Sequence, residues 1–226
     1  MSVVPLFDSQ IFILARPGAG VAERFLCLRL ERLPRIYRVA FAAACVERHA
    51  PRLRMEVALL AQGSEEFGIG LDLIWESALH EGIDPAWLTS MLQPCADPYR
   101  RQAAAAEDSI STMLACLEVA ISGDSEAALR VSRCVVRALE QQAAAAARRL
   151  SRQAQQQWPS PRARLERERQ FRDLSELQHT ASEPSVNLVR RLRDRAAMEA
   201  GLAPDETAFE PAQVWRALHQ GHSSAR

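Results

Sequence analysis

Hydrophobic residues recur at helical spacing along most of the chain from residue 23 onward. The clearest case is a stripe of apolar residues that stand three or four positions apart and so share one face of a helix. This stripe predicts an amphipathic helix that buries Trp75 and ends at Gly82. Its members are Leu71, Ile74, Trp75, Ala78 and Leu79.

Prolines, glycines and capping residues mark the ends of the other predicted helices. Pro34 and Pro51 each suit a first helical turn, because the amide hydrogen that proline lacks would have no partner there. Gly123 is expected to end a long helix, and the short connection makes the next helix its antiparallel neighbour. Ser182 is expected to cap the last helix and Gly201 to end it. The predicted helices cover residues 34–50, 51–63, 71–82, a short stretch after 84–85, 98–122, 124–157, 162–181 and 182–201.

These segments predict an all-α fold, a single bundle or globule of about seven helices over residues 25–201. The strongest internal break falls at residues 158–161, which read Trp-Pro-Ser-Pro. Residues 1–24 have no helical period and are expected to form an extra N-terminal arm. Residues 202–226 are expected to form a loosely ordered tail.

The segment 162–181 carries opposite charges four residues apart. Each such pair stabilises a helix by only ~0.3–0.5 kcal/mol, but together they favour an exposed helix. We therefore expect the region after residue 161 to engage a partner or a second copy of the chain. The alternative is that the helix packs on the bundle through Leu165, Phe171, Leu174 and Leu177. The four charged pairs are Arg162–Glu166, Arg164–Glu168, Arg169–Asp173 and Arg172–Glu176.

Composition and charge narrow the class of protein. The 28 basic residues, all arginine, balance 28 acidic residues, so no net charge draws the chain toward nucleic acid or anionic lipid. The chain shows no signal-peptide pattern and no apolar stretch of membrane-spanning length, which predicts a cytoplasmic protein with no membrane partner. The five cysteines are widely spaced and are expected to be reduced thiols rather than disulfides or zinc ligands. They are Cys27, Cys45, Cys95, Cys116 and Cys134.

Candidate chemistry centres on Asp72, Glu76 and His80, which are spaced four apart on the Trp75 helix. Asp72 and Glu76, with Asp108 or Glu47 from another helix, would be the centre of a small metal-dependent or acid/base enzyme. The competing interpretation is a solvated helix face, because Glu76 and His80 rotate away from the apolar stripe. We favour that interpretation, expect no cofactor or metal, and assign no catalytic residue.

A second alternative is binding of nucleic acid through the Arg148–Arg169 region. Interleaved acids such as Glu166 and Glu168 argue against it, because they neutralise the basic face that binding needs. The leading hypothesis is a non-enzymatic interaction or regulatory protein that acts through a protein partner or as a homo-oligomer.

Several motifs resemble one family in order and spacing. Residues 28–33 read Leu-Arg-Leu-Glu-Arg-Leu, residues 43–48 read Ala-Ala-Cys-Val-Glu-Arg, and residues 71–76 read Leu-Asp-Leu-Ile-Trp-Glu. Together with Ile121-Ser122-Gly123, they resemble the YjaG-like family, a bacterial domain of unknown function. The likeness runs from about residue 26 to 200 and diverges at both termini. It implies an all-helical fold and a link to bacterial signalling, but no activity.

Overall fold

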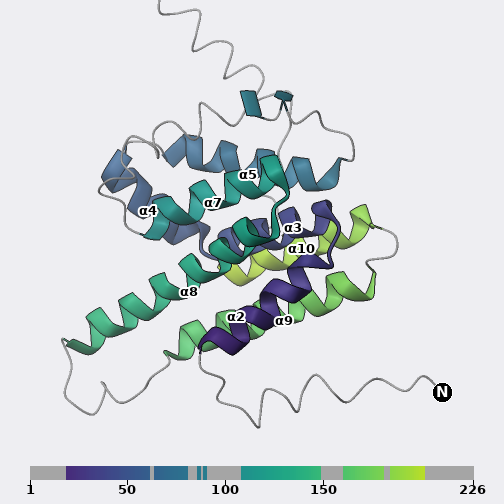
Figure 1. Cartoon of the computed structure of the whole chain (residues 1–226). Coiled ribbons are helices and arrows are strands. Elements are labelled where there is room, and N and C mark those ends of the chain that lie inside the picture. Colours follow the sequence, from purple (N-terminus) through teal and green to yellow (C-terminus); the bar gives the residue numbers. More distant parts are fainter. Residues whose placement is uncertain are drawn as a thin grey trace, which may run out of the picture.

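The computed structural model describes residues 19–61, 64–80, 86–87, 89–90, 108–148, 160–180 and 184–201. Within these ranges the regular structure is helical and no strand occurs, which confirms the predicted all-α fold. No helix of the described part is both long and apolar enough to cross a bilayer. The helices are α2 (Ala19–Glu31), α3 (Arg35–Glu47), α4 (Ala50–Ala61), α5 (Ser64–Leu79), α7 (Asp108–Ser122), α8 (Ser125–Arg148), α9 (Pro161–His179) and α10 (Val186–Ala200) (Figure 1).

The helix α3 lies at the centre of the bundle. It packs against α5, α7, α8, α9 and α10, and every side chain from Val39 to Val46 is fully buried. Such a continuous apolar run buries all faces of a helix, unlike the one-sided pattern of a surface helix. Around it, α5 and α7 lie on one side and α2 and α9 on the other (Figure 1).

The Trp75 stripe forms the inner face of α5, as predicted. Trp75 and Ile74 have no exposed surface, and Leu71 and Ala78 are each 1% exposed. The indole Nε1 of Trp75 donates a hydrogen bond of 3.0 Å to Glu47 Oε2 on α3. The residue at the predicted helix end, Gly82, lies outside the described residues.

The predicted turn between α7 and α8 is also present. Gly123 has a left-handed backbone (φ 66°), and Asp124 caps α8 by accepting a hydrogen bond of 2.9 Å from the Ala127 amide. A Cβ atom at position 123 would lie 2.5 Å from Cγ of Arg35, so glycine is needed for space as well as for conformation. The described part of this helix, α7, begins at Asp108, and residues 98–107 of the prediction lie outside the described residues.

Two predicted boundaries differ from the structure. The helix α2 begins at Ala19, inside the predicted N-terminal arm, while residues 1–18 and the tail after Gly201 lie outside the described residues. The cap of α10 is Ser185, whose Oγ accepts from the Leu188 amide, and Ser182 is not described. At the other end Gly201 adopts φ 79° and closes the helix as expected.

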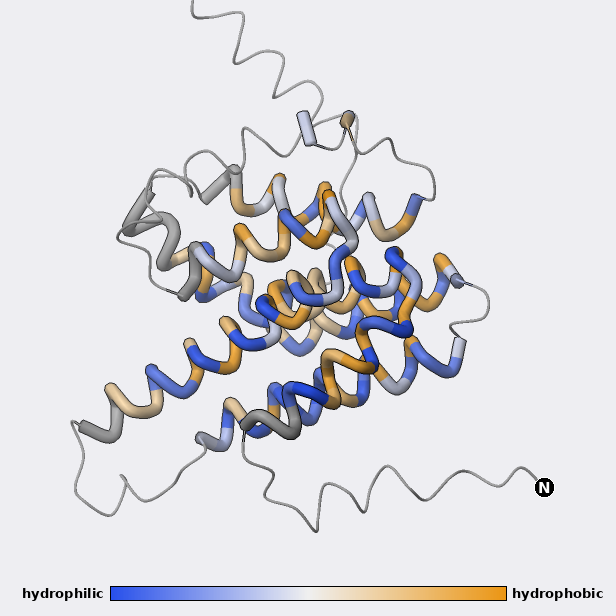
Figure 2. The backbone as a smooth tube through the Cα atoms, viewed as in Figure 1, coloured by the Kyte–Doolittle hydropathy of each residue, from blue (hydrophilic) through white to orange (hydrophobic). Residues whose placement is uncertain are grey.

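Residues 161–179 form a helix as predicted, but the helix packs on the bundle, which was the alternative interpretation, through Leu174, Leu177 and the partly buried Phe171, while Leu165 is exposed. The helix α9 packs on α8, α3 and α2, and it buries Ala163, Leu174 and Leu177. Polar residues dominate α9 (Figure 2), and this composition favoured exposure. Two of its acids, Glu166 and Asp173, lie seven residues apart on the inward face, where both are buried.

The charge pairs predicted within α9 are formed only in part. Arg164 and Glu168 pair at 3.0 Å as expected. Glu166 and Asp173 face the bundle and bind Arg48 at the end of α3. Glu176 is partly exposed and pairs with Arg195 of α10 at 2.7 Å.

The four described cysteines are free thiols. Cys45 and Cys116 are fully buried, while Cys27 and Cys134 are partly buried. Burial raises the pKa of the Cys45 and Cys116 thiols, so both are held in the neutral form. Cys95 lies outside the described residues.

Candidate functional site

A buried arginine at the end of α3 joins three helices. Nε and Nη2 of Arg48 donate to Glu166 of α9 at 2.8–3.2 Å, and Nη1 donates to Oδ2 of Asp173 at 2.6 Å. The Arg48 side chain has no exposed surface, and neither does that of Asp173. On the α10 side, Glu199 lies 3.9 Å from Arg48 Nη1. Charged groups so deeply buried persist only when they are paired.

The charges of this cluster stabilise each other. Burial alone would raise the pKa of Glu166, but attraction to Arg48 and hydrogen bonds from His49 and Arg48 outweigh it and lower the pKa to about 2. Burial would likewise lower the pKa of Arg48, but its acidic partners raise it overall. Glu166 is therefore ionised at neutral pH, and Arg48 remains a cation.

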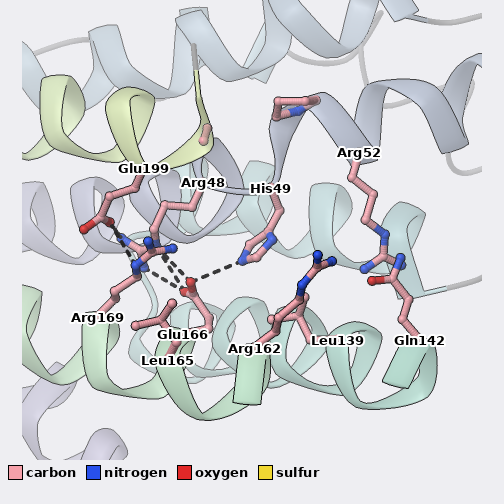
Figure 3. A pocket seen from close by; sticks show the side chains of 12 residues that line it. Arg48, His49, Arg52, Leu139, Gln142, Arg162, Leu165, Glu166, Arg169 and Glu199 are labelled. Atoms are coloured by element: carbon pink, nitrogen blue, oxygen red, sulfur yellow. Dashed lines mark hydrogen bonds and ion pairs between the residues drawn. The ribbon is translucent and has the colours of Figure 1, made fainter. Parts of the chain in front are cut away.

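The cluster forms one wall of a cavity of about 420 Å³ between α3, α4, α8, α9 and α10 (Figure 3). We call it the arginine pocket. Its charged lining residues are Arg48, Arg52, Arg162, Arg169, Glu166 and Glu199. The rest of the lining consists of His49 and Gln142 with the apolar Pro51, Leu139, Leu165 and Ala200.

The lining of the arginine pocket carries a positive charge on balance. Four arginines face two glutamates, and both glutamates are already engaged. Glu166 is bound by Arg48, and Glu199 pairs with Arg169 at 3.6 Å and with Arg172 at 2.8 Å. His49 adds a ring nitrogen 3.2 Å from Glu166 Oε2. Such a lining favours an anionic guest.

The two other arginines of the pocket come from the first turns of two helices. Arg52 follows Pro51 at the start of α4, and Arg162 follows Pro161 at the start of α9. Ser160 caps α9 by accepting a hydrogen bond of 3.1 Å from the Ala163 amide, which fixes the first turn and hence the origin of the Arg162 side chain. Figure 3 shows Arg52 beside Gln142 and Arg162 between them and His49.

The sequence-predicted residues on α5 do not converge on a single site. Asp72 turns to α10, where it accepts a hydrogen bond of 2.6 Å from Nη2 of Arg193. Glu76 pairs with His80 at 2.9 Å on the surface of its own helix. Asp108 begins α7, but its side chain lies outside the described part. The described residues contain no group of three or more His, Cys, Asp or Glu side chains placed to hold a metal ion.

Asp72 and Glu47 nevertheless share an environment. Burial raises the pKa of Asp72 to about 6, the attraction of Arg193 opposes that rise, and the nearby Glu47 carboxylate adds to it. Burial also raises the pKa of Glu47, against the hydrogen bond from Trp75. The guanidinium carbon of Arg193 lies 5.9 Å from the Trp75 ring centroid, so this cluster binds α3, α5 and α10 together.

The structure describes the side chains of only part of the Arg148–Arg169 region. Side chains 146–159 are not described. Beyond them Arg164 pairs with Glu168, Arg167 with Glu140 and Arg169 with Glu199. These ion pairs within the chain neutralise much of the basic face that the sequence suggested, whereas Arg162 points into the arginine pocket.

Sequence reasoning did not find Arg48 and His49. A signal was present, because Glu47, Arg48 and His49 follow directly on an apolar run that is buried on all sides. Polar residues at the end of such a helix stay within the bundle and need partners there. The seven-residue spacing of Glu166 and Asp173 was the matching signal on α9.

The geometry defines an all-helical protein with a cationic pocket at the junction of five helices. Comparison with protein-family models, curated proteins and solved structures gives no match to this chain. The YjaG-like resemblance thus stays a prediction that rests on the sequence motifs.

Proposed function

We propose that this chain is a non-enzymatic regulatory or interaction protein that works by binding an anionic group in the arginine pocket. The observation that carries the proposal is the charge of the lining, where four arginines face two glutamates that are already paired. The pocket volume of about 420 Å³ suits a small molecule or a single side chain of a partner.

The hydrogen bonds within the pocket wall favour binding over chemistry. Arg48 and Glu166 hold each other in fixed positions, and Glu166 also contacts His49, so each of these groups is occupied in the ground state. A preorganised cationic wall lowers the cost of binding, because little side-chain freedom remains to be lost. The free thiols fit a reducing compartment, and we place the protein in the bacterial cytoplasm, where the YjaG-like resemblance also suggests a role in signalling.

The two alternative functions have weaker support. An acid/base enzyme would need Asp72 and Glu76 to face a common substrate, but they bind Arg193 and His80 respectively. A nucleic-acid-binding surface would need arginines that face outward without neutralising acids, whereas Arg164, Arg167 and Arg169 are paired within the chain.

Calorimetric titration of the full chain with two simple dianions, inorganic pyrophosphate and isophthalate, tests the proposal. We expect at least one to bind, and Arg162→Gln to weaken that binding at least threefold. Arg164→Gln is the matched control, because Arg164 lies on the same helix but pairs with Glu168 outside the pocket. The proposal fails if neither dianion binds, or if the two variants bind equally well.

A further inference from the structure

The last described helix ends at the arginine pocket. Ala200, at the end of α10, is one of the lining residues, and Gly201 follows it with a left-handed backbone (φ 79°). We propose that the pocket is occupied by the chain's own C-terminal segment, residues 202–226, through the carboxylates of residues 202–210. This inference rests on the proposed function, because it names the source of the anionic group and with it the regulation of the pocket.

The charges of the C-terminal segment complement those of the pocket. Residues 202–210 read Leu-Ala-Pro-Asp-Glu-Thr-Ala-Phe-Glu, which includes three acids and no basic residue. Residues 211–226 contain arginines and histidines but no acid, so all carboxylate side chains of the segment lie in the part that follows Gly201 most closely. The pocket lining has four arginines against two glutamates, and both glutamates are already paired with arginines. Opposite charge therefore favours docking of residues 202–210.

The distance along the chain suits docking within one molecule. An extended residue spans at most ~3.6 Å, so Asp205 and Glu206 lie within ~18 Å of Gly201. A left-handed residue at a helix end is often followed by an apolar residue that packs back on the helix, and residue 202 is leucine. The segment is therefore expected to turn back toward the bundle beside Ala200, rather than continue along the axis of α10.

The other segment that adjoins the pocket in sequence has the wrong charge. Residues 149–159 connect α8, which contributes Leu139 and Gln142 to the lining, with the start of α9. They contain two arginines and no acidic residue, so they would add to the positive charge of the pocket. Of these two segments, only residues 202–226 can supply an anionic group.

The apolar part of the lining also matches the C-terminal segment. Leu165 lines the pocket and is 46% exposed, although it belongs to a helix that otherwise buries its leucines. Phe209 stands directly before Glu210 in the sequence, so one short stretch carries both an aromatic ring and a carboxylate. A segment that pairs its acids with the arginines can cover Leu165 with this ring, which removes apolar surface from water.

A docked segment would compete with every other anionic guest of the pocket. A ligand that is joined to its site by a short linker has an effective concentration on the order of millimolar. Carboxylates that bind weakly are therefore enough to fill the pocket. A partner or small molecule would have to displace the segment, so the segment sets the threshold for binding.

Two full-length variants of equal net charge test the proposal. The tail variant replaces the three acids of residues 202–210 by amides. The control variant replaces three exposed acids that lie outside the pocket lining. The substitutions are Asp205→Asn, Glu206→Gln and Glu210→Gln in the tail variant, and Glu118→Gln, Glu126→Gln and Asp194→Asn in the control variant.

Labelling of arginines with phenylglyoxal measures the occupancy of the pocket directly. Arg162 lines the pocket (Figure 3), whereas Arg164 lies on the same helix outside it. Mass mapping gives the rate at which each guanidinium is modified. We expect Arg162 to react at least threefold faster in the tail variant than in the unmodified chain and the control variant, and Arg164 to react equally in all three. Equal labelling of Arg162 in all three proteins would overturn the inference.

Calorimetric titration with pyrophosphate and isophthalate measures the competition. We expect the tail variant to bind at least fivefold more tightly than the unmodified chain, and the control variant to bind within twofold of it. If a dianion binds all three proteins equally, the segment does not occupy the pocket, but the proposed function stands. If no dianion binds any of them, both proposals fail. Faster labelling of Arg162 on dilution of the unmodified chain would assign the pocket to the segment of a second copy and overturn docking within one molecule.

Discussion

Replacing Arg48 by methionine would leave buried carboxylates without their cation. Methionine keeps most of the apolar stem of arginine, so the cavity it creates is small and the main effect is electrostatic. Asp173 would keep Arg195 at 3.0 Å, but Glu166 would retain only His49 at 3.2 Å and the Gln170 amide at 3.1 Å. Glu166 is 1% exposed, so its carboxylate is poorly hydrated and the lost partner is only weakly compensated by water.

Removal of one partner from a buried ion pair costs about 3–5 kcal/mol of unfolding free energy. Because Asp173 keeps a partner, we expect Arg48→Met to fall at the lower end, near ~3 kcal/mol. Arg164→Met is the control, since Arg164 is 74% exposed and its pair with Glu168 should contribute less than ~1 kcal/mol. Urea unfolding followed by circular dichroism measures both. A loss below ~1 kcal/mol for Arg48→Met, or one equal to the control, would refute the reasoning.

The pH dependence of the same variant provides a second check. In the native protein the pKa of Glu166 is lowered to about 2, so its contribution to stability is present above its unfolded pKa and is lost as the pH falls toward 2. Without Arg48 the pKa of Glu166 should rise, because burial then dominates. The variant's deficit in unfolding free energy should therefore shrink as the pH is lowered from 7 to 4. A deficit that stays constant over this range would show that Glu166 is not the source of the loss.

Three further predictions address other parts of the bundle. Gly123→Ala should cost about 2 kcal/mol or more, because it combines a left-handed backbone with a Cβ contact at 2.5 Å to Arg35; an unchanged melting temperature would contradict this. The pKa of Asp72 is raised to about 6, so its contribution to stability is present at low pH and is lost as the pH rises through 6. The unfolding free energy measured in urea should therefore fall between pH 4 and 7, and Asp72→Asn should remove this fall. An identical fall in both proteins would count against the prediction. The thiols of Cys45 and Cys116 should react with Ellman's reagent only after denaturation, and mass mapping of label on either thiol in the folded protein would contradict their burial.

The helices were predictable because their signals are local. The spacing of the Trp75 stripe, the turn at Gly123 and the stop at Gly201 each depend on a few neighbouring residues, and the structure reproduces all three. The charged face of α9 was not predictable in this way. The partner of Glu166 is Arg48, which lies 118 residues earlier in the chain. The sequence instead suggested a partner four residues away on the same helix, because α9 carries opposite charges at that spacing.

The arginine pocket was still harder to predict, since five helices contribute to it. Arg52 and Arg162 lie more than one hundred residues apart in the sequence, and they line the same pocket only because α9 docks on α3. Hydrophobic periodicity identifies the buried face of each helix, but it does not show which buried faces pack against each other. For Asp72 the sequence identified a candidate functional residue but could not supply Arg193 as its partner.

The double attachment of α9 to Arg48 has a consequence for how the bundle assembles. Glu166 and Asp173 stand about two turns apart on α9, yet both reach one guanidinium, so only one alignment of the helix satisfies them. A slip of one turn, ~5.4 Å, would carry both carboxylates past Arg48 and bury at least one without a cation. Leu174 and Leu177 alone would allow such a slip, because apolar contacts are not directional. The ion pairs thus select one docking position for α9, and with it the place at which Arg162 lines the arginine pocket.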